Sequence, residues 1–222
     1  MIGWIIGSVS ASLVFFVSYF VLSRRNFSFR FKMNYDIRNY FPYEFNFESR
    51  FVDNILGNCS LVMMAMFSIS FFAVSLTYLN LNSYLLFTAI SGVILTILIA
   101  AMNFVPLKLG RIHLILAVIL FAISFACPGS IALAAFREYQ ENNELYGLII
   151  MIVSGIFSLF MFALTMNPKL TMNIKMETKT NEKGENVLTR PKYIVVAFTE
   201  WLSIFSLLLD EILIVILLIF IK

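Results

Sequence analysis

Three carboxylates interrupt the last apolar segment of the chain. Glu200, Asp210 and Glu211 lie within residues 194–221, where all other residues are uncharged and most are Leu, Ile, Val or Phe. A carboxylate in an apolar environment can bind and release a proton or neutralise a cation, because the environment disfavours its charged form. Such residues in a membrane segment indicate an ion or proton site, or a site for a cationic ligand.

The spacing of these residues places them on one face of an α-helix. Glu200 and Glu211 are eleven residues apart, so a rotation of 100° per residue brings them within about 20° of each other. Ser203 and Asp210 lie about 60° and 80° from Glu200 in the same direction. A carboxylate at a helix centre disfavours membrane insertion by about 2.5–3.5 kcal/mol, so this face is predicted to turn toward other helices.

A structural role for the carboxylates is the competing hypothesis. Glu200 would lie near the cytoplasmic interface, and Asp210 and Glu211 would hydrogen-bond to polar groups of neighbouring helices. The candidate partners in other apolar segments are Asn58, Cys59, Ser60, Asn103, Ser124 and Ser130. No Lys or Arg is central in any apolar segment, so no ion pair is expected inside the membrane.

The composition predicts a bundle of membrane helices that would position these residues. Hydrophobic residues make up 60% of the 222 residues and charged residues only 13%, unlike a soluble globular protein. A span needs about 20 apolar residues, and six windows qualify: 3–22, 56–78, 84–104, 112–136, 145–166 and 194–221. We predict a single integral membrane domain over residues 1–222, an all-α polytopic bundle of six transmembrane helices.

The basic residues predict the orientation of this bundle. Fourteen of the 16 Lys and Arg residues fall in the connections 23–55, 105–111 and 167–193, and the opposite connections and termini hold only Arg137 and Lys222. Basic residues concentrate on the cytoplasmic side of membrane proteins. Both termini are therefore expected outside, with these three connections in the cytoplasm.

The first cytoplasmic connection combines aromatic and basic residues. Phe27, Phe29 and Phe31 alternate with polar residues, and this period of two is typical of a short strand or an extended segment on the inner membrane surface. The rings would enter the interface while the basic groups meet anionic headgroups. The predicted lipid contacts are Arg24, Arg25, Arg30, Lys32, Phe27, Phe29 and Phe31.

The third cytoplasmic connection has the pattern of a β-hairpin. Leu170, Met172, Ile174 and Met176 alternate with polar residues, and "NEKGEN" (181–186) provides a turn. An isolated hairpin is marginally stable, so the Phe27–Phe31 segment is a candidate partner strand. A mobile basic loop is the alternative.

The fourth predicted span contains Pro128 and Gly129. Proline lacks a backbone N–H, so the carbonyl four residues earlier needs another partner and a bend is expected. Broken helices form substrate sites in many transporters, but proline bends are also common in ordinary spans, and we favour a structural role. His113, the only histidine, is expected at the cytoplasmic interface.

The remaining features limit the function classes. Cys59 and Cys127 fall inside predicted spans and are interpreted as buried free thiols. No motif indicates a catalytic triad, a metal site or a cofactor, and the basic residues act as topology signals, which argues against nucleic-acid binding.

The leading hypothesis is a non-enzymatic accessory membrane subunit that contacts a membrane-protein partner through its basic, aromatic cytoplasmic loops. The alternative is a small transporter or channel-like protein that uses the acids of the last span. A membrane enzyme that uses these acids ranks third. The abundance of Phe, Ile, Asn and Lys fits an AT-rich bacterial genome, so a bacterial plasma membrane is the expected location.

Overall fold

Six long helices and one small sheet make up the part of the chain that the computed structural model describes, residues 2–46, 51–78, 83–105, 109–168, 170, 176–180 and 186–220. The helices are α1 (Ile2–Phe31), α2 (Ile55–Tyr78), α3 (Ser83–Met102), α4 (Gly110–Asn142), α5 (Leu145–Thr165) and α6 (Val195–Phe220). Two short 3-10 helices, η1 (Pro42–Phe45) and η3 (Phe51–Asn54), lie between α1 and α2.

All six long helices are long and apolar enough to cross a bilayer. They coincide with the six predicted apolar windows, and the chain is therefore a multi-pass integral membrane protein. The 30 residues of α1 rise about 45 Å, more than the roughly 30 Å hydrocarbon core, so its last turns extend beyond the apolar window. The 33 residues of α4 also extend past their window, at the opposite end of the bundle.

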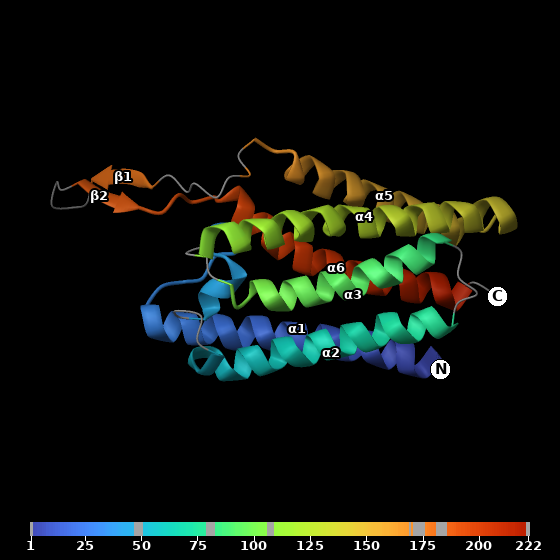
Figure 1. Ribbon diagram of the computed structural model, residues 1–222, viewed down its shortest axis with the longest axis horizontal. Helices are drawn as coiled ribbons and strands as arrows, with labels where there is room; N and C mark the ends of the chain where they lie inside the picture. Colours follow the sequence, from blue (N-terminus) through green and yellow to red (C-terminus); the bar gives the residue numbers. More distant parts are fainter. Residues whose placement is uncertain are drawn as a thin grey trace.

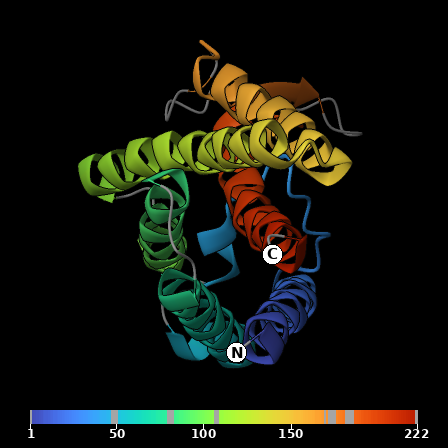
Figure 2. The same ribbon diagram turned by 90° about the vertical axis from the view of Figure 1, so that its right-hand side faces the viewer.

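The helices run side by side, and α6 packs against α1, α3, α4 and α5 (Figures 1 and 2). Both termini lie at one end of the bundle, called here the terminal end (Figure 1). The strands and the connection from α1 to α2 lie at the other end, called the hairpin end. The three connections rich in Lys and Arg therefore share the hairpin end.

The segment Phe27–Phe31 is helical, so its predicted extended conformation is wrong. A helix places Phe27 and Phe31 on one face, and their ring centroids are 4.7 Å apart. Phe27 is buried against Tyr35 and Tyr40, whereas the side chain of Phe29 is 75% exposed. The alternation of rings over five residues is too short to exclude a helix, and packing of Phe27 into the bundle decides the outcome.

The residue that follows the end of α1, Lys32, has a left-handed backbone (φ 55°). Its ammonium nitrogen lies 4.9 Å from the ring centroid of Phe29. The residues predicted to contact lipid differ in exposure. Phe27 points inward and Phe31 is partly buried, whereas the others are exposed: Arg24, Arg25, Phe29, Arg30 and Lys32.

The third connection contains a β-hairpin, as predicted, but its first strand begins after the predicted alternation of residues 170–176. Strand β1 (Glu177–Thr180) pairs antiparallel with β2 (Asn186–Thr189), with Glu177 opposite Thr189 and Thr180 opposite Asn186. Met172 and Ile174, part of the predicted alternation, lie outside the described residues. Because Phe27–Phe31 is helical, it supplies no third strand.

Candidate functional site

The polar face of α6 points into the bundle, as its spacing predicts. Each polar residue of the face is at most 2% exposed: Thr199, Glu200, Ser203, Ser206, Asp210 and Glu211. Glu200 lies near the hairpin end of α6, and Asp210 lies about 15 Å further along the helix axis. The face therefore carries two separate acidic positions, one near the hairpin end and one in the middle of the bundle.

Asp210 and Glu211 form the inner position. Among the described residues, none of their four carboxylate oxygens has a hydrogen-bond partner. The polar side chains that interact with Asp210 include the Cys127 thiol of α4 and the Ser206 hydroxyl, although neither reaches hydrogen-bond geometry. The expected hydrogen bonds from Asp210 and Glu211 to neighbouring helices are thus missing from this part of the structure.

Glu211 is turned about 100° around α6 from Asp210, toward α1 and α2. Its polar neighbours are Ser12 and Ser68, whose hydroxyl oxygens are 2.9 Å apart and bond to each other. One turn closer to the terminal end of α1, Ser8 is buried, and its hydroxyl has no partner among the described residues. Buried hydroxyls therefore continue from Glu211 toward the terminal end.

Glu200 at the outer position is paired with His113. The Nε2 atom of His113 lies 3.0 Å from Oε1 of Glu200, and the side chains are 0% and 2% exposed. The other ring nitrogen, Nδ1, lies 2.7 Å from the backbone oxygen of Val105. The two contacts hold the imidazole in place, so His113 is buried between helices near the hairpin end, and its predicted depth at the cytoplasmic interface stays a prediction.

Residues 32–46, called here the cap loop, cover this pair at the hairpin end. The rings of Phe41 and Tyr43 meet the His113 ring edge-on, with centroids 6.2 and 5.5 Å away. Trp201 of α6 donates its indole N–H to the backbone oxygen of Tyr40 across 3.0 Å. These contacts bury Glu200 and His113 beneath aromatic side chains.

The cap loop is also tied to the segment before α6. Arg190 binds both carboxylate oxygens of Glu44, at 2.7 and 3.0 Å, and Glu44 accepts the backbone N–H of Phe41. Tyr35 donates to the backbone oxygen of Phe41 across 2.7 Å, and burial raises the pKa of the Tyr35 phenol, so it remains a donor. Within the cap loop, Pro42–Phe45 form the 3-10 helix η1.

Asn58 and Asn103 meet each other, away from the inner acids. Asn103 donates to Oδ1 of Asn58 across 3.2 Å and accepts the Tyr19 hydroxyl at 2.7 Å. The Tyr19 ring also stacks on Trp201, which follows Glu200. The structure therefore places these asparagines near the outer position, and no described hydrogen bond joins them to Asp210 or Glu211.

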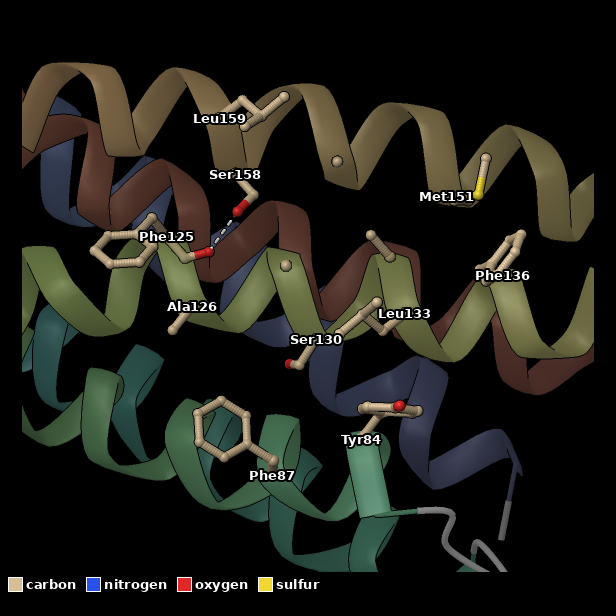
Figure 3. A pocket seen from close by; sticks show the side chains of 13 residues that line it. Tyr84, Phe87, Phe125, Ala126, Ser130, Leu133, Phe136, Met151, Ser158 and Leu159 are labelled. Atoms are coloured by element: carbon tan, nitrogen blue, oxygen red, sulfur yellow. Dashed lines mark hydrogen bonds between the residues drawn. The ribbon is translucent and has the colours of Figure 1, made fainter.

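Two serines from other helices bond to α4 beside Pro128. Ser206 of α6 donates to the backbone oxygen of Ser124 across 3.0 Å, which supplies the partner that Pro128 cannot. Ser158 of α5 donates to the backbone oxygen of Phe125 across 2.7 Å (Figure 3). A Cβ atom on Gly129 would lie 3.0 Å from the Ser158 hydroxyl, so glycine allows this approach. The bend of α4 stays a prediction.

The sequence hypothesis did not include several residues that surround the acids. His113 is 87 residues from Glu200, and no local pattern links them. Ser8 and Ser12 are four residues apart, so their shared helix face was the only available signal for the neighbours of Glu211. Among the described residues, no group of His, Cys, Asp and Glu could hold a metal ion. Comparison with protein-family models, curated proteins and solved structures finds no match for this chain.

Proposed function

We propose that this protein is a small membrane transport protein in which Asp210 and Glu211 bind and release protons. The observation that carries the proposal is the burial of both carboxyl groups without a hydrogen-bond partner or a basic neighbour among the described residues. An ionised carboxylate in such a place is strongly disfavoured unless a cation accompanies it. Each group therefore holds a proton in this state and can release it when water reaches it.

A proton suits these residues better than a metal ion. Consecutive residues of a helix are about 100° apart, so Asp210 and Glu211 point toward different neighbours and do not converge on one ion. A metal ion needs several ligands at once, whereas a proton needs one carboxylate oxygen.

The polar residues on either side of the inner acids favour transport over a purely local role. Toward the hairpin end, Ser206 and Ser203 precede the Glu200–His113 pair. Toward the terminal end, Ser12 and Ser8 follow Glu211. Packing alone requires only apolar side chains in the interior of a membrane bundle. A series of buried acids and hydroxyls is therefore better explained as a set of groups that bind water and protons.

Two expectations from the sequence belong to this proposal. The hairpin end faces the cytoplasm, because its connections contain most of the basic residues. The membrane is a bacterial plasma membrane.

Proton flux in liposomes tests the transport proposal. Liposomes containing the purified protein and a trapped pH indicator receive a potassium diffusion potential, which drives protons across the membrane. The wild-type protein is expected to acidify the interior faster than protein-free liposomes do. The Asp210→Asn, Glu211→Gln double variant is expected to abolish this difference, because an amide cannot exchange the proton.

The matched control is Glu141→Gln, which removes an exposed carboxylate that pairs with Arg137 at the end of α4. This variant is expected to retain the wild-type flux. A wild-type flux equal to that of protein-free liposomes, or a flux that survives in the double variant, contradicts the proposal.

An accessory subunit is the second candidate, and the hairpin is the observation that favours it. Strands β1 and β2 extend beyond the helices at the hairpin end (Figure 1), where their open edges could pair with a partner strand. The cap loop favours a partner less, because its aromatic residues Tyr35, Phe41 and Phe45 are buried within the chain itself. Purification in mild detergent with a stoichiometric partner would support this candidate.

A further inference from the structure

A cavity of about 440 Å³ lies at the hairpin end, between the last turns of α1 and the start of α2, away from the acids of α6. Its α1 wall is formed by residues three and four positions apart, which make one stripe of the helix: Leu22, Arg25, Asn26, Phe29 and Arg30. Val52, Asp53 and Leu56 contribute to the opposite wall. The cavity thus combines basic, acidic and apolar side chains.

The basic groups of the cavity leave donors for a ligand. Arg30 pairs with Oδ1 of Asp53 across 3.2 Å, and Oδ2 of Asp53 is buried without a hydrogen-bond partner among the described residues. Arg25 is exposed and takes part in none of the ion pairs between described residues. Two guanidinium groups and one carboxylate give the cavity a net positive charge, which complements an anion.

The apolar rim indicates that the anion belongs to a lipid. Phe29, Val52 and Leu56 are 75%, 69% and 66% exposed. The segment Ile2–Leu22 rises about 30 Å, the thickness of the hydrocarbon core, so Arg25 follows at the level of the headgroups. A soluble anion would make no favourable contact with these apolar side chains, whereas the acyl chains of a phospholipid would cover them.

We propose that this cavity binds the headgroup of an anionic phospholipid of the phosphatidylglycerol type. Arg25 and Arg30 contact the phosphate. The acyl chains lie along Phe29, Val52 and Leu56. This proposal does not depend on proton binding by α6, so an experiment can contradict one of the two proposals and leave the other intact.

Native mass spectrometry of the full-length protein in detergent tests the site, with phosphatidylglycerol or phosphatidylcholine added in increasing amounts. The wild-type protein is expected to bind its first phosphatidylglycerol more tightly than phosphatidylcholine. Arg25→Gln is expected to weaken this binding about fivefold, the typical effect of one basic residue near anionic lipid. Arg25 is exposed, so the variant should fold normally.

Arg111, at the start of α4, provides the matched control, because it is exposed at the hairpin end but does not line the cavity. Arg111→Gln is expected to leave the affinity for phosphatidylglycerol unchanged. Equal weakening by both substitutions would indicate general surface charge and overturn the site. Equal affinity of the wild-type protein for both lipids would overturn it as well, and displacement of the lipid by glycerol phosphate at similar concentration would show that a soluble anion is the ligand.

Discussion

Asp210 and Glu211 are consecutive residues of α6, and the helix turns their carboxyl groups toward different neighbours. Asp210 lies near Cys127 and Ser206, whereas Glu211 lies near the bonded pair Ser12 and Ser68. Each acid therefore has its own environment, and the two should respond separately to substitution.

Neutral substitution of Asp210 separates a proton site from interhelical bonding. Asp210→Asn is expected to change the free energy of unfolding by less than about 1 kcal/mol, because no hydrogen bond of the carboxylate is lost. Reversible unfolding in mixed detergent micelles measures this quantity. A loss of more than about 2 kcal/mol would instead indicate that Asp210 holds helices together.

The His113–Glu200 pair should stabilise the bundle as a unit. His113→Ala and Glu200→Ala are each expected to lower the free energy of unfolding by about 2 kcal/mol, because each leaves a buried polar partner unsatisfied. The double variant is expected to lose about 1–3 kcal/mol less than the sum of the two. Additive losses would show that the two side chains do not interact, and the exposed Glu141→Gln variant serves as the control with little effect.

The hydroxyl of Ser206 should matter because Pro128 lacks a backbone N–H. Ser206→Ala is expected to lower the free energy of unfolding by about 1 kcal/mol, since the oxygen of Ser124 loses its partner. Ser158→Ala is the matched control and should have a smaller effect, because the oxygen of Phe125 can still accept the helical N–H of Gly129.

A second substitution makes this test specific. Pro128→Ala restores a backbone N–H and should stabilise the Ser206→Ala variant more than it stabilises the wild-type protein. Equal effects in the two backgrounds would mean that the oxygen of Ser124 does not depend on Ser206.

Cysteine labelling tests the orientation of the bundle. Asn142→Cys and Thr178→Cys introduce exposed thiols at the terminal and hairpin ends of a variant that lacks Cys59 and Cys127. In intact cells, a membrane-impermeant reagent is expected to label Cys at position 142 only, because basic connections remain in the cytoplasm. Labelling at position 178 alone would show that the orientation is the reverse of the predicted one. Labelling at both positions would contradict the six-span topology.

Features with a strong local signal could be predicted from the sequence. Apolar windows of about 20 residues predict the six helices, and the spacing of Glu200, Ser203 and Glu211 predicts which face of α6 is buried. The turn sequence between β1 and β2 predicts the hairpin. In the helices the pattern repeats often enough to distinguish one period from another, whereas the hairpin depends on one turn sequence.

Contacts between distant segments could not be predicted in this way. His113 follows Arg111 near the start of α4, and nothing in that local context indicates that packing of α4 against α6 places its ring on Glu200. Asn103 was assigned to the acids because it is polar, but its depth in the bundle matches that of Tyr19. The sequence alone gives the face of a helix more readily than the relative depth of residues on different helices.

Infrared difference spectroscopy of the reconstituted protein tests most directly whether the inner acids bind protons. The spectra of the wild-type protein at low and high pH are compared in the region where the C=O bond of a protonated carboxylic acid absorbs. We expect a band that gains intensity as the pH falls, one part of which is missing in Asp210→Asn and another part in Glu211→Gln, while Glu141→Gln retains both. A pH-dependent band that neither Asp210→Asn nor Glu211→Gln alters would contradict proton binding by these residues.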